Sequence, residues 1–413
     1  MAERRGYHMF YITVLIIIAL FILDIILTVL DYRQRKQPIP DIVADVYNKE
    51  EYKKWLDYTM ENFKLKIYSK VTDTSLLIVL FVVGYFPKIS VIIESITRNK
   101  LVQSLIFLGL FAVINYISNI GFGLYKTFNL EQRYGFNTTS IKTFITDQLK
   151  SMALTLILGG GLIYLLLYLY ETYGNLAILY SWVIVISLML VLNILYTRLF
   201  IRLFNTLTPL PEGELYDKAM ALALSLGYEI KSISVMDASK RSTRLNAFFT
   251  GFGKFKSIIL YDTLLDKMST DEIISVLAHE IGHSINKDVL KNIITSIVQI
   301  GAYLAILSFF LSSQTLSIAF GFTQVNYGFA IILFGILMEP IGILINIPLS
   351  AISRKAEYLA DKCAAEAGYR NAMISALKVL ARANFVNLTP HALNVKLTYS
   401  HPTIKQRLEA LHK

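Results

Sequence analysis

Two histidines and a glutamate make up the segment with the clearest chemistry in this chain, His279-Glu280-Ile281-Gly282-His283. Residues four apart lie one turn above each other on a helix, so both imidazoles can bind one cation. Zinc lowers the pKa of a bound water to about 7, and a neighbouring carboxylate, here Glu280, can accept a proton from that water as it attacks a peptide carbonyl. The motif therefore predicts a zinc peptidase that forms no covalent intermediate. A chance match on a buried amphipathic helix is the alternative.

The residues before the motif predict the helix that this chemistry requires. Ser269 and Glu272 have the spacing of a capping box. An apolar stripe at helical spacing follows them and consists of Ile273, Ile274, Leu277 and Ile281. We therefore expect both histidines on one face of a helix.

A third zinc ligand must come from elsewhere, because a catalytic zinc usually has three protein ligands and one position for water. The metzincin pattern is excluded, since Asn286 and Val289 stand where its glycine and third histidine would be. Glu357 is the best candidate, and Asp361, one turn later, can accept the N–H of a ligating imidazole and so orient it. Two solvated charges on a helix are the alternative interpretation of this pair.

The composition is that of a polytopic membrane protein, with 54% hydrophobic and 17% charged residues. A helix needs about 20 residues to cross a bilayer. Apolar stretches of that length lie near residues 9–30, 74–96, 101–124, 152–170, 176–199, 293–311 and 329–352. We expect seven crossings, which place the two termini on opposite sides of the membrane. The second stretch contains Pro87 and Lys88 and the last contains Glu339 and Pro340, so their bounds are the least defined.

The charges between these stretches predict an orientation. Lysines and arginines crowd the connection after the first stretch, whereas residues 171–175 and 312–328 contain none. The positive-inside rule then places the first connection, residues 200–288 and the tail after 352 in the cytosol. Both segments with candidate zinc ligands share that compartment.

The net charge of +10 is concentrated next to the predicted spans, where anionic lipid headgroups are the natural partner. No nucleic-acid motif is present, so we expect no nucleic-acid partner. The single cysteine, Cys363, excludes an intramolecular disulfide and is consistent with a reducing cytosol.

A polar insert between the fifth and sixth stretches precedes the histidine motif. It contains a helical pattern near 213–226 and three strand-like runs at 232–236, 246–251 and 257–261. We expect a small sheet here, whose edge strand can bind an extended substrate and hold the scissile bond over the metal.

Several motifs in the same order together resemble the type I CAAX prenyl proteases, integral-membrane zinc endopeptidases that process farnesylated proteins. The resemblance extends over nearly the whole chain. Besides H-E-I-G-H and the S-R-x-x-E-Y-x-A-D segment at 353–361, it includes Asp31-Tyr32-Arg33-Gln34, residues 125–128 and 134–137, residues 203–210, Lys240-Arg241-Ser242, Asn246-Ala247-Phe248 and Ser400-His401-Pro402.

The resemblance implies roles for individual residues. His279, His283 and Glu357 would bind one Zn²⁺ per chain, with Glu280 as general base and Asp361 supporting a ligand. Further candidates lie outside these two helices. Asn246 on the edge strand and His401 in the His-Pro turn would hydrogen-bond the substrate backbone, and His401 would also stabilise the oxyanion. Arg407 is either an orienting residue or a surface residue.

The resemblance also implies a mainly α fold. Seven membrane helices would form a barrel around a chamber, and a small α+β zinc-peptidase domain of the gluzincin type would lie on its cytosolic side. Glu339 would face that chamber, or it is a satisfied or neutralised glutamate at a proline kink. The expected division is a membrane domain at 1–205, a cytosolic insert with the edge strand and motif helix at 206–288, spans six and seven at 289–352, and a cytosolic helical part at 353–413 that supplies the third ligand.

Three functions follow as hypotheses. The first is removal of the last three residues of prenylated CAAX proteins, in the endoplasmic reticulum membrane of a eukaryote. The second is zinc-dependent quality control of membrane proteins, suited to a bacterial inner membrane. The third is a non-enzymatic transporter or channel. The Thr243-Arg244-Leu245-Asn246 segment, where many eukaryotic members have Ser-His-Ser-Asn, leaves the substrate open.

Overall fold

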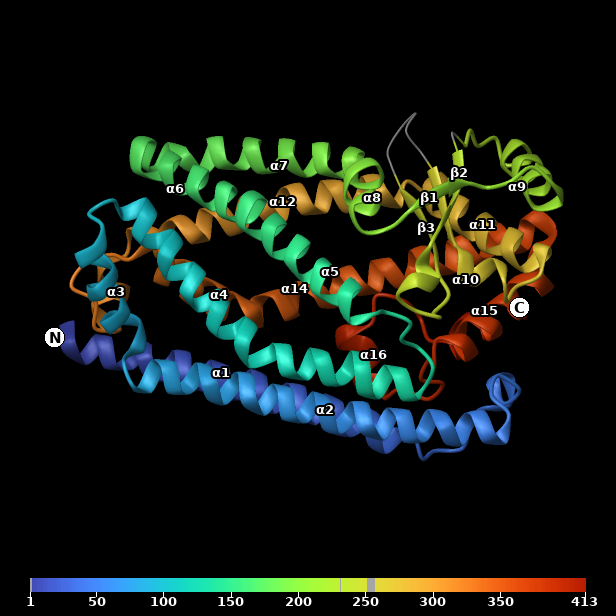
Figure 1. Ribbon diagram of the computed structural model, residues 1–413, viewed down its shortest axis with the longest axis horizontal. Helices are drawn as coiled ribbons and strands as arrows, with labels where there is room; N and C mark the ends of the chain where they lie inside the picture. Colours follow the sequence, from blue (N-terminus) through green and yellow to red (C-terminus); the bar gives the residue numbers. More distant parts are fainter. Residues whose placement is uncertain (1, 231, 251–256) are drawn as a thin grey trace.

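Long helices dominate the computed structural model, which describes residues 2–230, 232–250 and 257–413 (Figure 1). They lie roughly along the long axis of the molecule, and a small sheet with shorter helices gathers at one end. The helices of the first half are α1 (Ala2–Gln34), α2 (Lys49–Val82), α3 (Tyr85–Ile96), α4 (Lys100–Tyr125), α5 (Ile141–Leu154), α6 (Gly161–Tyr173), α7 (Ala177–Leu195) and the single turn α8 (Arg202–Phe204). The prediction of a mainly α membrane protein is confirmed.

Three of these helices continue into π-helical turns, which are η2 (Lys126–Glu131) after α4, η3 (Thr155–Gly160) after α5 and η5 (Tyr196–Ile201) after α7. Two glycines with positive φ break the helical run. Gly84 (φ 63°) separates α2 from α3, which are bent by 66° relative to each other, and Gly174 (φ 55°) ends α6 before α7 runs back beside it (Figure 1).

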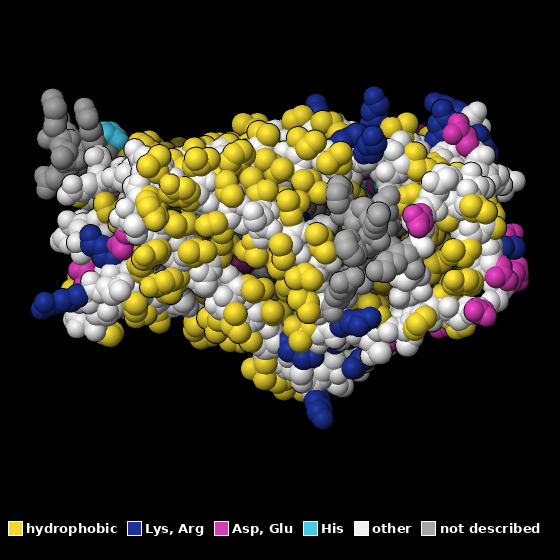
Figure 2. Space-filling model, turned by 90° about the horizontal axis from the view of Figure 1, so that it is seen from above, with side chains coloured by type: hydrophobic (Ala, Val, Ile, Leu, Met, Phe, Trp, Pro, Cys, Tyr) yellow, Lys and Arg dark blue, Asp and Glu magenta, His cyan; other side chains and the backbone are white. Residues whose placement is uncertain are grey.

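By length and apolar composition, the described residues contain five helical stretches able to cross a membrane, or six when the bent pair α2 and α3 is one span. The stretch Ile141–Leu195 contains the fourth predicted span and most of the fifth. Only 6% of its most apolar window is buried within the protein, so this surface requires lipid around it. Figure 2 shows hydrophobic side chains over much of one face, with most charges in the half that holds the sheet and at the opposite tip. Membrane insertion is thus supported, and the count of seven stays a prediction.

The sheet has the order β1-β2-β4-β3, in which β2 and β4 are parallel and the outer pairs are antiparallel. Its strands are β1 (Leu207–Pro209), β2 (Ser232–Met236), β3 (Ala247–Thr250) and β4 (Ser257–Tyr261). The three predicted strands are present, although Gly251 lies outside the described residues. Strand β1 was not predicted, because its three residues end in a proline on an edge strand. The strand next to Asn246, β3, is an edge strand as expected.

Some of the remaining helices lie beside the sheet and others belong to the membrane half. They are α9 (Glu214–Ser225), α10 (Asp262–Leu265), α11 (Thr270–Ile285), α12 (Asp288–Ser312), α13 (Gln314–Ala319), α14 (Tyr327–Ala364), α15 (Arg370–Ala383), α16 (Ala392–Thr398) and α17 (Ile404–Leu411). Helix α11 lies at the centre of the core beside the sheet, where Ile274, Leu277, Ala278 and Ile281 are fully buried together with Ile258 and Leu260 of β4. The histidine motif is therefore carried by the most enclosed helix of this half.

Candidate metal centre

The capping box predicted for the motif helix is present at the start of α11. The backbone N–H of Ser269 donates to Glu272 Oε2 (2.8 Å), and the N–H of Glu272 donates to Ser269 Oγ (3.4 Å). These bonds satisfy two of the N–H groups that a helix start leaves without partners. The helix then reaches His279 and His283 without a break, and their rings lie one above the other, 4.7 Å between centroids.

Gly282 allows α11 to lie directly against α14. A Cβ atom at this position would be 2.9 Å from Cys363 Cβ and 3.0 Å from Ala360 Cα. Ala360 is itself fully buried, so the two helix backbones meet with no large side chain between them. This close approach brings Glu357, one turn before Ala360 on the same helix, to the histidines.

Three side chains converge between these helices. His283 Nε2 lies 3.2 Å from His279 Nε2 and 3.3 Å from Glu357 Oε1, and His279 Nε2 lies 3.6 Å from Glu357 Oε2. Each residue offers one ligand atom, and these three atoms lie within 4.8 Å of one another. Buried Glu357 Oε2 has no hydrogen-bond partner in the described part of the chain. An orphaned carboxylate oxygen beside two imidazole nitrogens is the donor set that a transition-metal cation satisfies.

Carboxylates behind both imidazoles orient them. The Nδ1–H of His279 donates to Asp361 Oδ1 (2.9 Å), and the Nδ1–H of His283 donates to Asp288 Oδ2 (3.1 Å). Both bonds favour the tautomer that leaves Nε2 free for a cation. The structure thus places Asp361 in the supporting position expected for it, and it adds Asp288, which sequence reasoning missed.

Asp288 reaches the site through a turn rather than through a helical face. Lys287 has a left-handed conformation (φ 57°, ψ 33°) between α11 and α12, and this turn brings Asp288 back under His283. Lys291 Nζ holds the other carboxylate oxygen at 3.0 Å. The only signal in the sequence was a lone acidic residue five positions after His283.

Arg407 of α17 is a third group that supports the site, after Asp361 and Asp288. Its Nε donates to Asp361 Oδ2 (2.8 Å) and its Nη2 to Asp361 Oδ1 (2.6 Å), a bidentate pair, while Nη1 lies 3.6 Å from Glu357 Oε2. Its side chain is 12% exposed, so the surface role left open for it is wrong. Arg407 instead orients the carboxylate behind His279.

The electrostatics of the site favour positive charge between the ligands. Burial lowers the pKa of His283, but hydrogen bonds to Glu357 and Asp288 and their charge outweigh it and raise that pKa to about 9. Glu280 lies on the same helix beside the two histidines, and burial raises the pKa of its carboxyl above the ordinary glutamate value. A carboxylate with increased proton affinity is suited to accept a proton.

The two predicted substrate-binding residues lie at different places around this centre. His401 is 64% exposed, and its Nδ1 lies 2.9 Å from Glu357 Oε1, so it belongs to the cluster. Asn246 is exposed immediately before β3, and its backbone carbonyl accepts a hydrogen bond from Tyr261 N (3.1 Å). The structure shows no direct contact between Asn246 and the histidines among the described residues.

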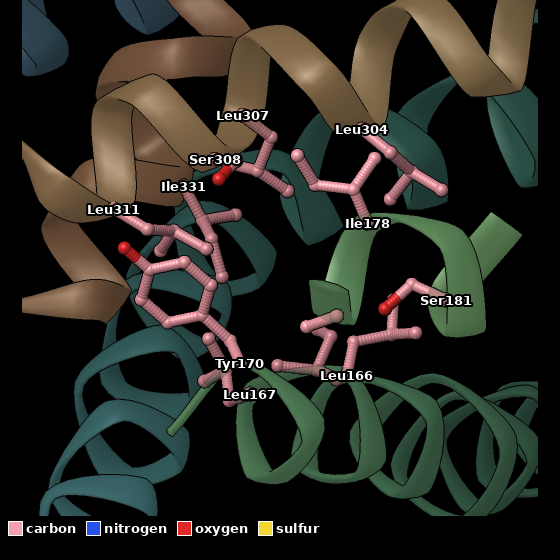
Figure 3. Close-up of a pocket in the computed structure, with 12 residues that line it drawn as sticks. Leu166, Leu167, Tyr170, Ile178, Ser181, Leu304, Leu307, Ser308, Leu311 and Ile331 are labelled. Carbon is pink, nitrogen blue, oxygen red and sulfur yellow. The ribbon is translucent and has the colours of Figure 1, made fainter. Parts of the chain in front are cut away.

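Among the described residues, a cavity of about 750 Å³ lies between α2 and α4, and two smaller cavities lie further along the membrane helices. Glu339 lines one of about 220 Å³ with Asp24, Lys70 and Asp73, and Lys70 is paired with Asp24 at 2.5 Å. The other, of about 120 Å³, is walled by apolar side chains of α6, α7, α12 and α14 with Ser181, Ser308 and Tyr170 (Figure 3). Its described lining residues are uncharged.

A helix-borne pair of histidines with a glutamate from a second helix, in a protein with a lipid-facing apolar surface, defines a membrane metallopeptidase. Residues 28–206 match the family described as CAAX prenyl protease N-terminal, five membrane helices, and residues 209–413 match peptidase family M48. The chain belongs to the M48 peptidases of the CAAX prenyl protease type and is a metalloendopeptidase.

Relatives of this type are similar over almost their full length. The CAAX prenyl protease 1 homolog of Oryza sativa subsp. japonica is 31% identical, with 95% of each chain covered. The CAAX prenyl protease 1 of Saccharomyces cerevisiae is 31% identical over 95% of this chain and 93% of the yeast protein. The crystal structure of S. mikatae Ste24p superposes with a TM-score of 0.92 at 29% identity, covering 98% of this chain and 99% of that one.

Proposed function

We propose that this protein is a zinc endopeptidase that removes the C-terminal aaX tripeptide from prenylated CAAX proteins. The observation that carries the proposal is the convergence of His279, His283 and Glu357 with an orphaned carboxylate oxygen, in a chain that is similar end to end to CAAX prenyl proteases. A transporter or channel, the third hypothesis, is not the class to which the chain belongs.

The residues present fit a zinc ion held by His279 Nε2, His283 Nε2 and one oxygen of Glu357. A bound zinc would supply Lewis acidity toward the attacking water and the scissile carbonyl. Glu280 accepts the proton of the attacking water and then delivers it to the leaving amine, for which its raised pKa is suited. Asp361 and Asp288 keep the two imidazoles in the tautomer that binds a metal.

We assign substrate binding to two exposed residues, His401 before α17 and Asn246 before β3. His401 Nδ1 lies 2.9 Å from Glu357 Oε1, and we assign the other ring nitrogen, Nε2, to the substrate or to the developing oxyanion. Asn246 stands at the start of edge strand β3, where an extended peptide can pair with the free side of the strand. Together they would hold the peptide backbone across the metal.

The proposed setting is a membrane with the site on the cytosolic side. Taking α2 and α3 as one bent span and dividing Ile141–Leu195 at Gly174 gives the seven crossings expected from the sequence. The density of lysine and arginine in the first connection supports a cytosolic site. In a eukaryotic cell the membrane would be that of the endoplasmic reticulum, and in a bacterium the inner membrane.

The test is cleavage of a farnesylated CAAX peptide and of its unmodified counterpart by the purified, zinc-loaded protein, with Glu280→Gln as control. Selective cleavage of the farnesylated peptide that requires Glu280 is the expected result. Equal cleavage of both peptides would favour the second hypothesis, quality control of membrane proteins. Absence of zinc-dependent cleavage of either peptide would refute the proposal.

A further inference from the structure

The side chain of Asn384 forms two hydrogen bonds with the backbone of Leu245, the residue before Asn246. The N–H of Leu245 donates to Asn384 Oδ1 (2.9 Å), and Asn384 Nδ2 donates to the Leu245 carbonyl (3.0 Å). One carboxamide therefore satisfies both polar groups of one residue, as a neighbouring strand would. Leu245 is 3% exposed, so these bonds are shielded from water.

Arg244 fixes the same segment from the opposite side. Its Nη1 donates to the Asn384 carbonyl (2.8 Å), and its Nη2 donates to the Tyr58 hydroxyl (2.7 Å) and to Glu131 Oε2 (3.2 Å). The guanidinium also lies over the Phe136 ring, 4.2 Å from its centroid. Tyr58 belongs to α2, and Glu131 belongs to η2 at the end of α4. Arg244 therefore connects the segment before β3 to two long helices of the membrane domain.

We call Asn384 and Arg244, with their hydrogen bonds, the clamp. Neighbouring hydrogen bonds hold the same segment. The N–H of Thr243 donates to the Phe136 carbonyl (3.1 Å), and its hydroxyl donates to the Gly135 carbonyl (2.8 Å). The Arg244 carbonyl accepts from the Thr263 hydroxyl at 2.8 Å. Consecutive residues before Asn246 are thus fixed through their backbone, while the Asn246 side chain stays exposed.

The Asn384 end of the clamp holds an unfavourable backbone conformation. Phe385 has a φ of 53°, which costs energy for a residue with a bulky side chain. Trp55 Nε1 donates to the Phe385 carbonyl (3.1 Å), and the Tyr47 hydroxyl donates to the Val386 carbonyl (2.9 Å). Two buried aromatic residues thus stabilise a strained turn that presents Asn384 to Leu245.

We propose that Asn384 and Arg244 are positioning residues for the substrate: they fix the segment 243–246 so that Asn246 and β3 are ready to bind an extended peptide. The inference rests on the proposed role of Asn246. It also gives a role to Arg244, which stands where many eukaryotic family members have histidine. An arginine can bond Tyr58, Glu131 and the Asn384 carbonyl at the same time. Among the described residues, no hydrogen bond or ion pair joins either positioning residue to His279, His283 or Glu357.

The test compares Asn384→Asp and Arg244→Lys with wild type in steady-state cleavage of the farnesylated peptide. The aspartate keeps the acceptor for the Leu245 N–H but turns an oxygen toward the Leu245 carbonyl. The lysine keeps the charge but cannot serve three acceptors. We expect KM to rise about 10-fold for each, the equivalent of one or two lost hydrogen bonds, with unchanged zinc content and a smaller change in kcat.

Arg382→Ala is the matched control. Arg382 precedes Asn384 by two residues and donates to the backbone carbonyls of Val46 and Asp45, away from the strand. Its loss should lower the thermal midpoint without raising KM. An unchanged KM in both clamp variants, or a rise that equals that of Arg382→Ala, would overturn the proposal.

A second readout does not depend on turnover. Backbone amides of residues 243–248 should exchange with deuterium faster in Asn384→Asp than in wild type, and not in Arg382→Ala. Equal exchange in all three proteins would overturn the proposal even where KM changes. If wild type cleaves neither peptide, the proposed function fails, and the exchange experiment still decides whether the clamp orders the strand.

Discussion

Substitution of Gly282 by alanine should weaken metal binding by separating two helices. The new Cβ would lie 2.9 Å from Cys363 Cβ, 3.0 Å from Ala360 Cα and 3.3 Å from the Ala360 carbonyl oxygen. Carbon atoms in contact prefer about 3.5–4.0 Å. Two of the three close atoms belong to the α14 backbone and cannot rotate away, so α11 and α14 must move apart by about 0.5–1 Å.

That movement acts directly on the ligand set. His283 Nε2 and Glu357 Oε1 are 3.3 Å apart and come from the two helices that would separate. Metal sites tolerate deviations of about 0.2 Å around zinc–ligand bonds of about 2.0–2.2 Å. We therefore expect a loss of metal affinity of about 10- to 100-fold, as for other changes that misplace a ligand. Alanine is more favourable than glycine within a helix by about 1 kcal/mol, so helix propensity alone would stabilise α11 in the variant. A loss of metal affinity would therefore have to come from the packing of α11 on α14.

The assay is zinc stoichiometry by mass spectrometry, followed by competition with a chelator of known affinity. Gly335→Ala is the control, because Gly335 also lies in α14 and a Cβ there would have no neighbour within 4 Å. It should bind zinc like wild type. Wild-type zinc affinity and cleavage in Gly282→Ala would refute the argument that close packing of α11 on α14 sets the site.

Three further predictions follow from the site and its surroundings. Glu280→Gln should keep zinc but lose cleavage by about 10²–10⁴-fold, measured as kcat, because an amide cannot accept the proton that we assign to the Glu280 carboxylate. Asp288→Ala should lower zinc affinity by about 10- to 100-fold in chelator competition, because His283 loses the acceptor at Nδ1; unaltered affinity would contradict its supporting role. Burial raises the pKa of Tyr47, whose hydroxyl bonds the Ala381 and Val386 carbonyls. The folded state resists ionisation, so stability should be full below the unfolded tyrosine pKa of about 10 and fall as the pH rises above it. Tyr47→Phe should lower the thermal midpoint at pH 7 but reduce this alkaline loss, and parallel pH profiles for both proteins would show the reasoning to be wrong.

The residues that could be predicted from the chain alone are those whose spacing is local. His279 and His283 share a helical face, and Ser269 with Glu272 marks the start of that helix, so four positions define the element. Glu357 was ambiguous, because the two histidines lie more than 70 residues away and a lone carboxylate on a helix carries no signal of what it faces.

Other features depended on tertiary structure. Asp288 acts through the left-handed turn at Lys287, and no periodicity in the sequence describes a turn of this kind. Asn246 and His401 became candidates only through resemblance to a family, because an asparagine before a strand and a histidine before a proline are common in loops. The break at Gly174 within an apolar stretch, by contrast, was anticipated, since the hydropathy falls between 170 and 176.

The structure places the chemistry and the substrate on supports of different kinds. Both ligand helices are continuous: α11 is buried in the core, and α14 is one helix of 38 residues that runs from the membrane spans past Glu357. The membrane domain and the third ligand are therefore connected without a loop. The segment before β3 has no such helix and depends on Asn384 and Arg244. It follows that changes in the α11–α14 contact should act on metal occupancy, and changes in the clamp on KM, with little effect of either on the other.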